Sequence, residues 1–106
     1  MRSPCLLLCA SLLVDSTAAE TLSTERQAEL RHLLYQDCGS CHGMRLTGGL
    51  GPALTPKALH GKPRELLIAT VSEGRPGTPM PPWKPLLSKT EIAWLVDYMI
   101  GTEKRP

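Results

Sequence analysis

The chain has 106 residues and a formal net charge of +2, with 12 basic and 10 acidic residues. This length allows one small domain, and the charges are too balanced to indicate a nucleic-acid-binding protein. There is no phenylalanine, and aromatic residues make up only 4% of the chain. A domain this small, without large aromatic side chains, needs a disulfide, a metal or a cofactor to complete its interior.

The first 19 residues have the organisation of a signal peptide. A basic start at Arg2 precedes an apolar run from Cys5 to Val14, and small residues follow at positions 17–19. The run is short for a helix that spans a bilayer, which counts against the alternative of an uncleaved membrane anchor. We therefore expect a signal peptide over residues 1–19, cleaved after Ala19, and one mature domain over residues 20–106.

A first helix is predicted over about residues 23–37. Thr24 and Gln27 have the spacing of a capping box at its start. Leucines at positions 30, 33 and 34 form an apolar face at helical spacing. The helix leads directly into the segment with the clearest chemical signature.

That segment is a Cys-x-x-Cys-His motif at residues 38–42, the sequence typical of covalent c-type haem attachment. Cys38 and Cys41 are spaced to add to the two vinyl groups at one edge of a porphyrin. His42 then offers an imidazole nitrogen to the iron from the same side. A haem is also a large apolar plate, which would supply the interior that the composition lacks.

Two alternatives explain the motif less well. A disulfide between its cysteines, as in a thioredoxin-like redox site, leaves the histidine unexplained and requires a βαβ context that this chain lacks. A structural zinc site needs about four ligands, and only His32 and His60 remain as obvious further donors.

Residues 43–61 contain many glycines and prolines and are predicted to form a loop. A haem-ligating histidine usually donates its second ring N–H to a fixed acceptor. Gly51-Pro52 follows His42 by about ten residues and is placed to return a backbone carbonyl to the ring. An ordinary turn is the alternative interpretation of these two residues.

A short second helix is predicted between Pro63 and Gly74, because proline favours a helix start and glycine a helix end. Positions 66, 67, 70 and 71 give it one buried side. A third helix is predicted from Ser88, paired with Glu91 as a capping box, to about Gly101. Its core stripe comprises positions 92, 95, 96 and 99, with the aromatic residues 94 and 98 on a neighbouring face.

The loop over residues 74–85 contains five prolines and Met80, the favoured sixth ligand of the iron. Prolines on both sides stiffen the unfolded chain, which reduces the entropy lost when the weak iron–thioether bond forms. Met44 is held on the proximal side, and Met99 fits the apolar stripe of the last helix. His60 is the alternative ligand, and it would give bis-histidine ligation and a lower reduction potential.

Three segments, in this order and spacing, resemble the class I c-type cytochromes: the motif at residues 38–42, Gly51-Pro52-x-Leu54 and Gly77-Thr78-Pro79-Met80-Pro81-Pro82-Trp83. The resemblance covers nearly the whole mature chain. It implies an all-α cytochrome c fold, with three main helices and proline- and glycine-rich loops around one covalent haem c. It further implies that the carbonyl of Pro52 holds His42 and that Leu54 contacts the haem.

More narrowly, residues 35–44 and 46–54 resemble the NirC type of small periplasmic monohaem cytochrome, encoded with the nitrite reductase of denitrifying bacteria. The same stretches resemble the cytochrome c domain of that reductase. The resemblance implies a monomeric periplasmic electron carrier in denitrification that donates electrons to nitrite reductase. It implies no enzyme activity, because both axial positions of the iron would be filled.

Two other functions stay open. One is an accessory role in making or delivering the d-type haem of nitrite reductase. The other is a peroxidase or gas sensor, which would need an open sixth position on the iron.

In this family one edge of the haem reaches the surface, and the partner protein docks there. The loops over residues 43–61 and 74–87 contain four basic residues and no acidic residue: Arg45, Lys57, Arg75 and Lys84. They predict a mildly basic rim that steers an acidic redox partner. The alternative is a solvated surface whose charges only aid solubility.

Overall fold

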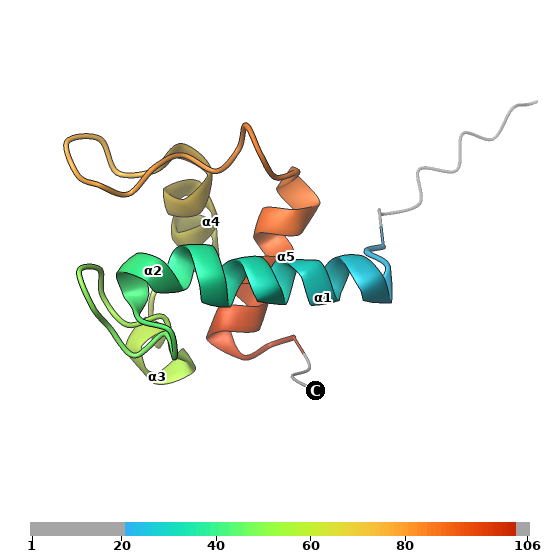
Figure 1. Ribbon diagram of the computed structural model, residues 1–106, viewed down its shortest axis with the longest axis horizontal. Helices are drawn as coiled ribbons and strands as arrows, with labels where there is room; N and C mark the ends of the chain where they lie inside the picture. Colours follow the sequence, from blue (N-terminus) through green and yellow to red (C-terminus); the bar gives the residue numbers. More distant parts are fainter. Residues whose placement is uncertain (1–20, 104–106) are drawn as a thin grey trace, which may run out of the picture.

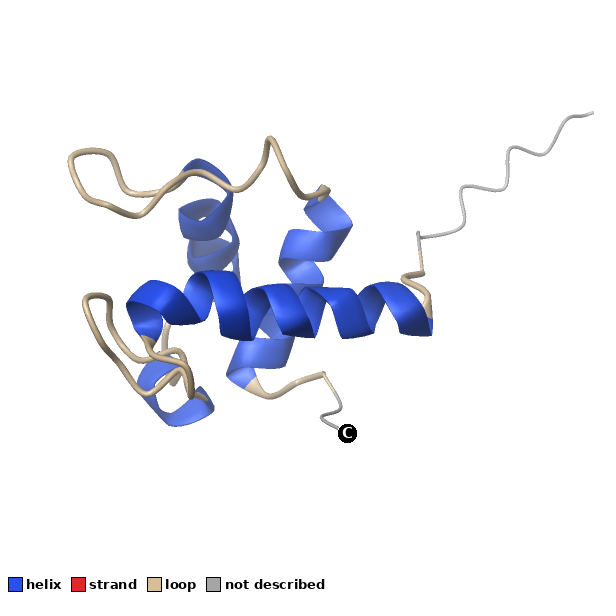
Figure 2. Cartoon of the chain, viewed as in Figure 1, coloured by secondary structure: helices blue, strands red, loops and turns tan. Residues whose placement is uncertain are grey.

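The computed structural model describes residues 21–103. The predicted signal peptide and its cleavage site lie outside this range. The described part is helical and contains no strand (Figures 1 and 2), as the sequence predicted. Its elements are α1 (Thr24–Leu33), a π-helical turn (Leu34–Cys38), α2 (Gly39–His42), α3 (Pro56–Leu59), α4 (Arg64–Glu73) and α5 (Lys89–Ile100). Within residues 21–103, no helix is long and apolar enough to cross a membrane.

The first helical segment continues beyond the predicted end near residue 37. A π-helical turn follows α1, in which the amide of Gly39 donates to the carbonyl of Leu34, five residues earlier. Helix α2 then carries the segment to His42, and Gly43 ends it with a φ of +93°. A Cβ at Gly43 would lie 2.6 Å from the carbonyl oxygen of Gly48, so only glycine fits at this turn. The Cys-x-x-Cys-His motif is therefore helical throughout.

The cap of α1 differs from the predicted one by one residue. Ser23 is the N-cap, and its hydroxyl accepts a hydrogen bond of 3.1 Å from the amide of Arg26. The predicted capping box of Thr24 and Gln27 is wrong, because the Gln27 side chain donates to the carbonyl of Leu22 instead. Serine and threonine are both good N-cap residues, so the sequence alone did not determine whether Ser23 or Thr24 caps the helix.

Helix α5 lies against α1, α3 and α4 and carries most of the core (Figure 1). The predicted capping box of Ser88 and Glu91 is present. The buried residues of α5 include the predicted stripe and also both aromatic residues, whose rings stack with centroids 5.5 Å apart: Ile92, Trp94, Leu95, Val96, Tyr98 and Met99. More of α5 is buried than a single stripe because several helices surround it.

Helix α3 lies inside the segment that the sequence predicted to be a loop. Thr55 caps it by accepting from the amide of Ala58, and Pro56 occupies its first position. A threonine followed by a proline is a recognisable helix start, so this signal was available in the sequence. The buried Leu59 anchors the short helix beside α5.

Candidate functional site

A cavity of about 810 Å³ opens between the helices and the two long loops. Its wall is formed by the helical Cys-x-x-Cys-His segment, the loop at residues 50–54, helix α4, the loop at residues 75–83 and two side chains of α5. Every segment in which the sequence predicted cofactor-binding residues therefore contributes to the wall of this one cavity.

All six residues predicted to bind the cofactor line this cavity: Cys38, Cys41, His42, Pro52, Leu54 and Met80. They come from three separate segments of the chain. The alternative ligand His60 is exposed at the end of α3 and does not line the cavity. Met44 is 57% exposed and does not line it either. Met99 is buried in the core, as predicted, and one side of it also faces the cavity.

The imidazole of His42 is held by the loop that follows the motif. Its Nδ1 lies 2.7 Å from the carbonyl oxygen of Pro52. A carbonyl can only accept, so this contact requires a proton on Nδ1 and leaves Nε2 as the nitrogen available to a metal. Two backbone hydrogen bonds of 2.8 Å each hold this loop against the motif. The amide of Gly51 donates to the carbonyl of Cys41, and the amide of Gly48 donates to the carbonyl of His42.

Gly51 provides the space that the imidazole occupies. A Cβ at this position would lie 2.6–3.1 Å from three atoms of the His42 ring, closer than van der Waals contact allows. The sequence indicated Gly51 only together with Pro52, as a pair placed to return a backbone carbonyl to His42 or, alternatively, as an ordinary turn. Its steric role depends on a contact between residues nine positions apart, which the pattern of residues does not reveal.

Cys38 and Cys41 form no disulfide in the described part of the chain. Burial, assisted by the nearby charge of Asp37, raises the pKa of Cys38 to about 11. A redox-active dithiol needs a lowered thiol pKa, so the environment of Cys38 argues against a thioredoxin-like site. Within residues 21–103, no three His, Cys, Asp or Glu side chains are grouped so that they could hold a metal ion. The zinc alternative therefore gains no support from this part of the chain.

Helix α4 leaves apolar side chains facing the cavity. None of its residues is buried, although the predicted apolar side, residues 66, 67, 70 and 71, lines the cavity wall. Leu66 is 56% exposed, and Leu50, in the loop after the motif, is 92% exposed. A large apolar group in the cavity would cover this surface, and the donors along the wall are those that hold a c-type haem. The residues present therefore fit a haem.

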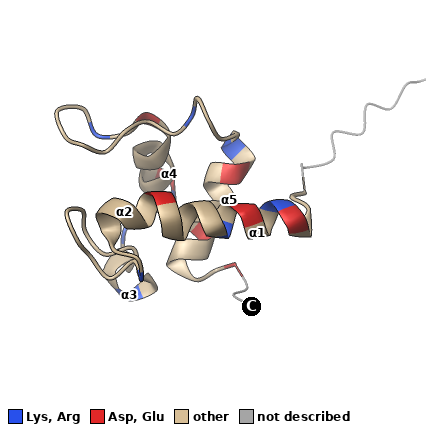
Figure 3. Cartoon of the chain, viewed as in Figure 1, with Lys and Arg blue, Asp and Glu red and all other residues tan. Residues whose placement is uncertain are grey.

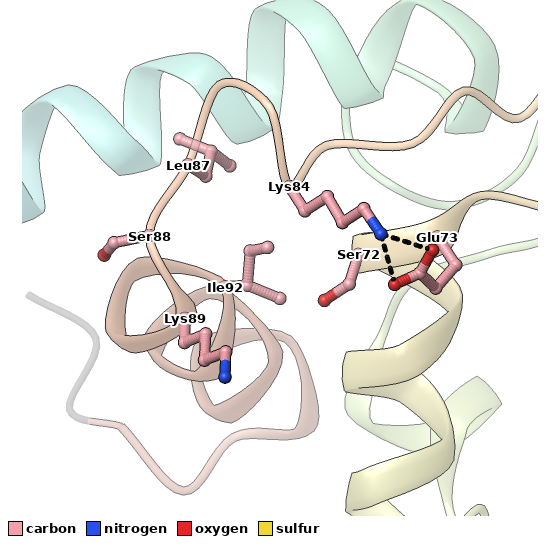
Figure 4. A pocket seen from close by; sticks show the side chains of 7 residues that line it. All are labelled: Ser72, Glu73, Lys84, Leu87, Ser88, Lys89 and Ile92. Carbon is pink, nitrogen blue, oxygen red and sulfur yellow. Dashed lines mark hydrogen bonds and ion pairs between the residues drawn. The ribbon is translucent and has the colours of Figure 1, made fainter.

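A smaller hollow of about 430 Å³ lies between the end of α4 and the start of α5 (Figure 4). Lys84 lies at this hollow and forms an ion pair of 2.9 Å with Glu73. The prediction that Lys84 belongs to a basic rim of the cofactor site is therefore wrong. The carboxylate of Glu73, the last residue of α4, offsets the charge of Lys84. The two side chains meet because the loop after α4 folds back over the end of that helix.

Two basic residues do line the large cavity, Arg75 and Lys62. Arg75 was predicted and Lys62 was missed, because it lies in the short link between α3 and α4, outside the loops considered. The predicted Arg45 and Lys57 are exposed but do not line the cavity. The loop after α4 carries basic positions only, whereas acidic positions concentrate on the helices (Figure 3).

Comparison with known proteins agrees with these features. The family model described as "Cytochrome C oxidase, cbb3-type, subunit III" matches residues 25–99. Cytochrome c55X of Pseudomonas aeruginosa is 67% identical, over 84% of this chain and 75% of that protein. Cytochrome c55X of Stutzerimonas stutzeri is 57% identical, over 95% of this chain and 89% of that protein.

Two solved structures are similar as well. The c-type cytochrome NirC is 68% identical, with a TM-score of 0.75, over 80% of this chain and 100% of that one. Dihydro-heme d1 dehydrogenase NirN, in complex with DHE, is 30% identical, with a TM-score of 0.62. That match covers 72% of this chain but 16% of the dehydrogenase.

The predicted fold and family are thus confirmed. The relatives that match along most of their length are small c-type cytochromes, which carry electrons and are not enzymes. Membership of such a family implies a covalently bound haem c. This chain belongs to the small c-type cytochromes of the cytochrome c55X and NirC type.

Proposed function

We propose that the chain is a monomeric periplasmic carrier of single electrons, with one haem c attached through Cys38 and Cys41. His42 and Met80 are the proposed axial ligands. The observation that carries this proposal is one largely apolar cavity whose wall contains both thiols, the imidazole and the thioether. When bound there, a haem supplies the one-electron oxidation and reduction of its iron.

The residues of the chain have distinct tasks in this proposal. Cys38 and Cys41 would hold the haem through thioether bonds to its two vinyl groups. The carbonyl of Pro52 fixes the orientation of His42, which presents Nε2 to the iron. Met80 would supply a second ligand to the iron and would raise the reduction potential above that of a bis-histidine site. Leu54 and the apolar wall exclude water.

We further infer that the process is denitrification and that the partner is nitrite reductase. Similarity to a cytochrome named NirC over 100% of that chain supports this assignment. The match to NirN covers 16% of that dehydrogenase and by itself does not favour a role in making the d-type haem.

The basic residues that form no ion pair in the described part of the chain support a redox partner with an acidic surface patch. Acidic residues on the helices are engaged in ion pairs with Arg26, Arg64 or Lys84: Glu29, Glu65, Glu73, Glu91 and Asp97. In the described part of the chain, no ion pair involves Arg45, Lys57, Lys62 or Arg75. These four residues are here called the basic face. Lys62 and Arg75 line the cavity together with the single acidic residue Asp37, so the wall carries a net positive charge that can steer an acidic surface.

Stopped-flow mixing of the reduced holoprotein with oxidised nitrite reductase tests the proposed function. Rapid oxidation of the cytochrome, followed by nitrite turnover, is the expected result. No electron transfer at any ionic strength, together with a deletion strain whose reductase lacks its d-type haem, would overturn the donor role in favour of haem maturation.

A further inference from the structure

The loop that carries Met80 is closed at its base on α4. The amide of Trp83 donates to the carbonyl of Val71 over 3.0 Å, and the amide of Lys84 donates to the carbonyl of Ser72 over 3.2 Å. These bonds join the two ends of the loop at the last turns of the helix. They fix where the loop starts and ends but do not by themselves determine the position of residue 80.

A second closure lies inside the loop, next to Met80. The amide of Arg75 donates to the carbonyl of Met80 over 3.1 Å, and the amide of Thr78 donates to the carbonyl of Arg75 over 3.1 Å. The second bond spans Pro76-Gly77, and Gly77 has a φ of +78°. Proline followed by a glycine with positive φ is the signature of a type II turn. Residues 75–80 therefore form a small closed unit.

The hydroxyl of Thr78 connects this turn to Met80. It donates to the carbonyl of Arg75 over 2.6 Å and accepts from the amide of Met80 over 3.3 Å. One side chain thus bonds to residues on both sides of the turn. Without the hydroxyl, the amide of Met80 would lose this partner, and only the two backbone bonds, from the amide of Arg75 to the carbonyl of Met80 and from the amide of Thr78 to the carbonyl of Arg75, would hold the unit closed.

Gly74 determines how closely the segment after the turn approaches α4. It has a φ of +68°, and a Cβ there would lie 2.7 Å from the carbonyl oxygen of Met80 and from the carbonyl carbon of Pro81. Those atoms belong to the backbone and cannot move aside as a flexible side chain could. A larger residue at position 74 would push residues 80–82 away from the helix.

We propose that Thr78 and Gly74 are positioning residues that hold the Met80 thioether at the iron. Thr78 acts by bonding across the turn, and Gly74 acts by allowing the close passage of residues 80–82. The proposal rests on the proposed function, because it takes Met80 as the sixth ligand. A thioether binds iron weakly, so the rigidity of the loop determines how readily another ligand replaces it.

The test is a titration of the oxidised holoprotein with imidazole, which competes with Met80 for the iron. Loss of the weak far-red absorption band reports displacement of the thioether. Thr78→Val removes both hydrogen bonds of the hydroxyl and should increase the apparent imidazole affinity by at least about fivefold, the equivalent of losing one of them. Thr78→Ser keeps the hydroxyl and should retain the wild-type affinity. Thr102→Val is the matched control, because it removes a comparable bond to the carbonyl of Asp97 at the end of α5.

Gly74→Ala should increase imidazole affinity by more than Thr78→Val and should weaken the far-red band even without imidazole. Gly61→Ala is its control, since Gly61 has a similar φ of +79° but a Cβ added there would meet no atom within 4 Å. Far-ultraviolet circular dichroism and haem colour on a denaturing gel show whether each variant is folded and loaded.

The outcomes separate this inference from the proposed function. If Met80→Ala leaves the far-red band and imidazole affinity unchanged, Met80 is not the ligand and the proposed ligation is wrong. If Met80→Ala abolishes the band while Thr78→Val and Thr78→Ser both match the wild type, ligation stands and the role of Thr78 is overturned. If Gly74→Ala affects imidazole affinity no more than Gly61→Ala does, the role of Gly74 is overturned.

Discussion

The carbonyl oxygen of Pro52 lies 2.7 Å from Nδ1 of His42, and Gly51 leaves the space in which that imidazole lies. The hydrogen bond and the space come from adjacent residues of one loop. The loop therefore determines both the tautomer of the ring and its position. This pairing makes the environment of His42 testable without replacing the histidine itself.

Gly51→Ala should displace the imidazole, because the new Cβ would overlap the ring. Overpacking of this kind typically destabilises a site by about 1–3 kcal/mol. We expect a lower yield of holoprotein and a shifted haem absorption spectrum. Gly39→Ala is the control, because a Cβ there would make only ordinary contacts of 3.5 Å or more, with Met44 and Leu34. Equal effects of the two substitutions would contradict the steric role of Gly51.

The proposed attachment of haem through both cysteines predicts that the haem colour survives denaturation. Mature protein made with a periplasmic haem-ligation system should retain haem on a denaturing gel. Cys38→Ser or Cys41→Ser should sharply lower the amount of holoprotein. Without haem the remaining core is small, so circular dichroism should show the apoprotein to be largely unfolded. Haem that is lost completely on the gel would disprove covalent attachment.

The choice between Met80 and His60 as sixth ligand can be made by substituting each residue. Met80→Ala should open the iron, abolish the far-red band of the oxidised form and let carbon monoxide bind the reduced form. The reduction potential should fall, because a thioether favours reduced iron. His60→Ala should change none of these properties, because His60 does not line the cavity. The reverse pattern would make His60 the ligand.

The ion pair between Arg26 and Glu91 ties α1 to α5 over 2.8 Å. The hydrogen bond from Arg26 holds the pKa of Glu91 below its ordinary value, with a further bond from the backbone of Ser88. A lowered pKa in the folded state contributes stability that is complete above the unfolded value, about 4.3. That contribution is lost as the pH falls through the folded value.

Glu91→Gln keeps an acceptor for the capping box but removes the charge. The variant should be less stable at pH 7, by up to about 1 kcal/mol, and should lose less stability than the wild type between pH 5 and pH 3. Guanidinium unfolding of the holoprotein at several pH values measures both effects. Glu25→Gln is the control, since Glu25 has no ion pair within residues 21–103. Parallel pH profiles of Glu91→Gln and the wild type would refute this account.

The basic face predicts a salt-dependent rate of electron transfer. Arg75→Glu should slow association with an acidic partner severalfold at low ionic strength, and the difference should shrink as salt screens the charges. Lys89→Glu changes the net charge equally, but Lys89 lies at the smaller hollow (Figure 4) and should affect the rate less. Electron transfer that is fast and independent of salt would contradict the steering role of the basic face but would be consistent with the proposed role as electron donor.

The sequence alone was sufficient to predict those features that depend on residues close together in the chain. The spacing of Cys38, Cys41 and His42, the capping box at Ser88 and the prolines around Met80 are all local patterns. Each pattern has a direct physical meaning, because cofactor attachment, helix capping and loop stiffness act over a few residues. The family resemblance added the carbonyl of Pro52 as the partner of His42, which the structure contains, and it implied a haem contact at Leu54, which lines the cavity.

Tertiary structure decided the features that join distant residues. The fit of Gly51 against His42, the passage of Met80 over Gly74 and the pairing of Lys84 with Glu73 each depend on how separate segments pack. The same packing brought Lys62 to the cavity and left the apolar side of α4 along the cavity wall, although Leu67 and Val71 also pack against the core. Periodicity predicts that a helix has an apolar side, but only the arrangement of all helices determines whether that side meets protein or a bound group.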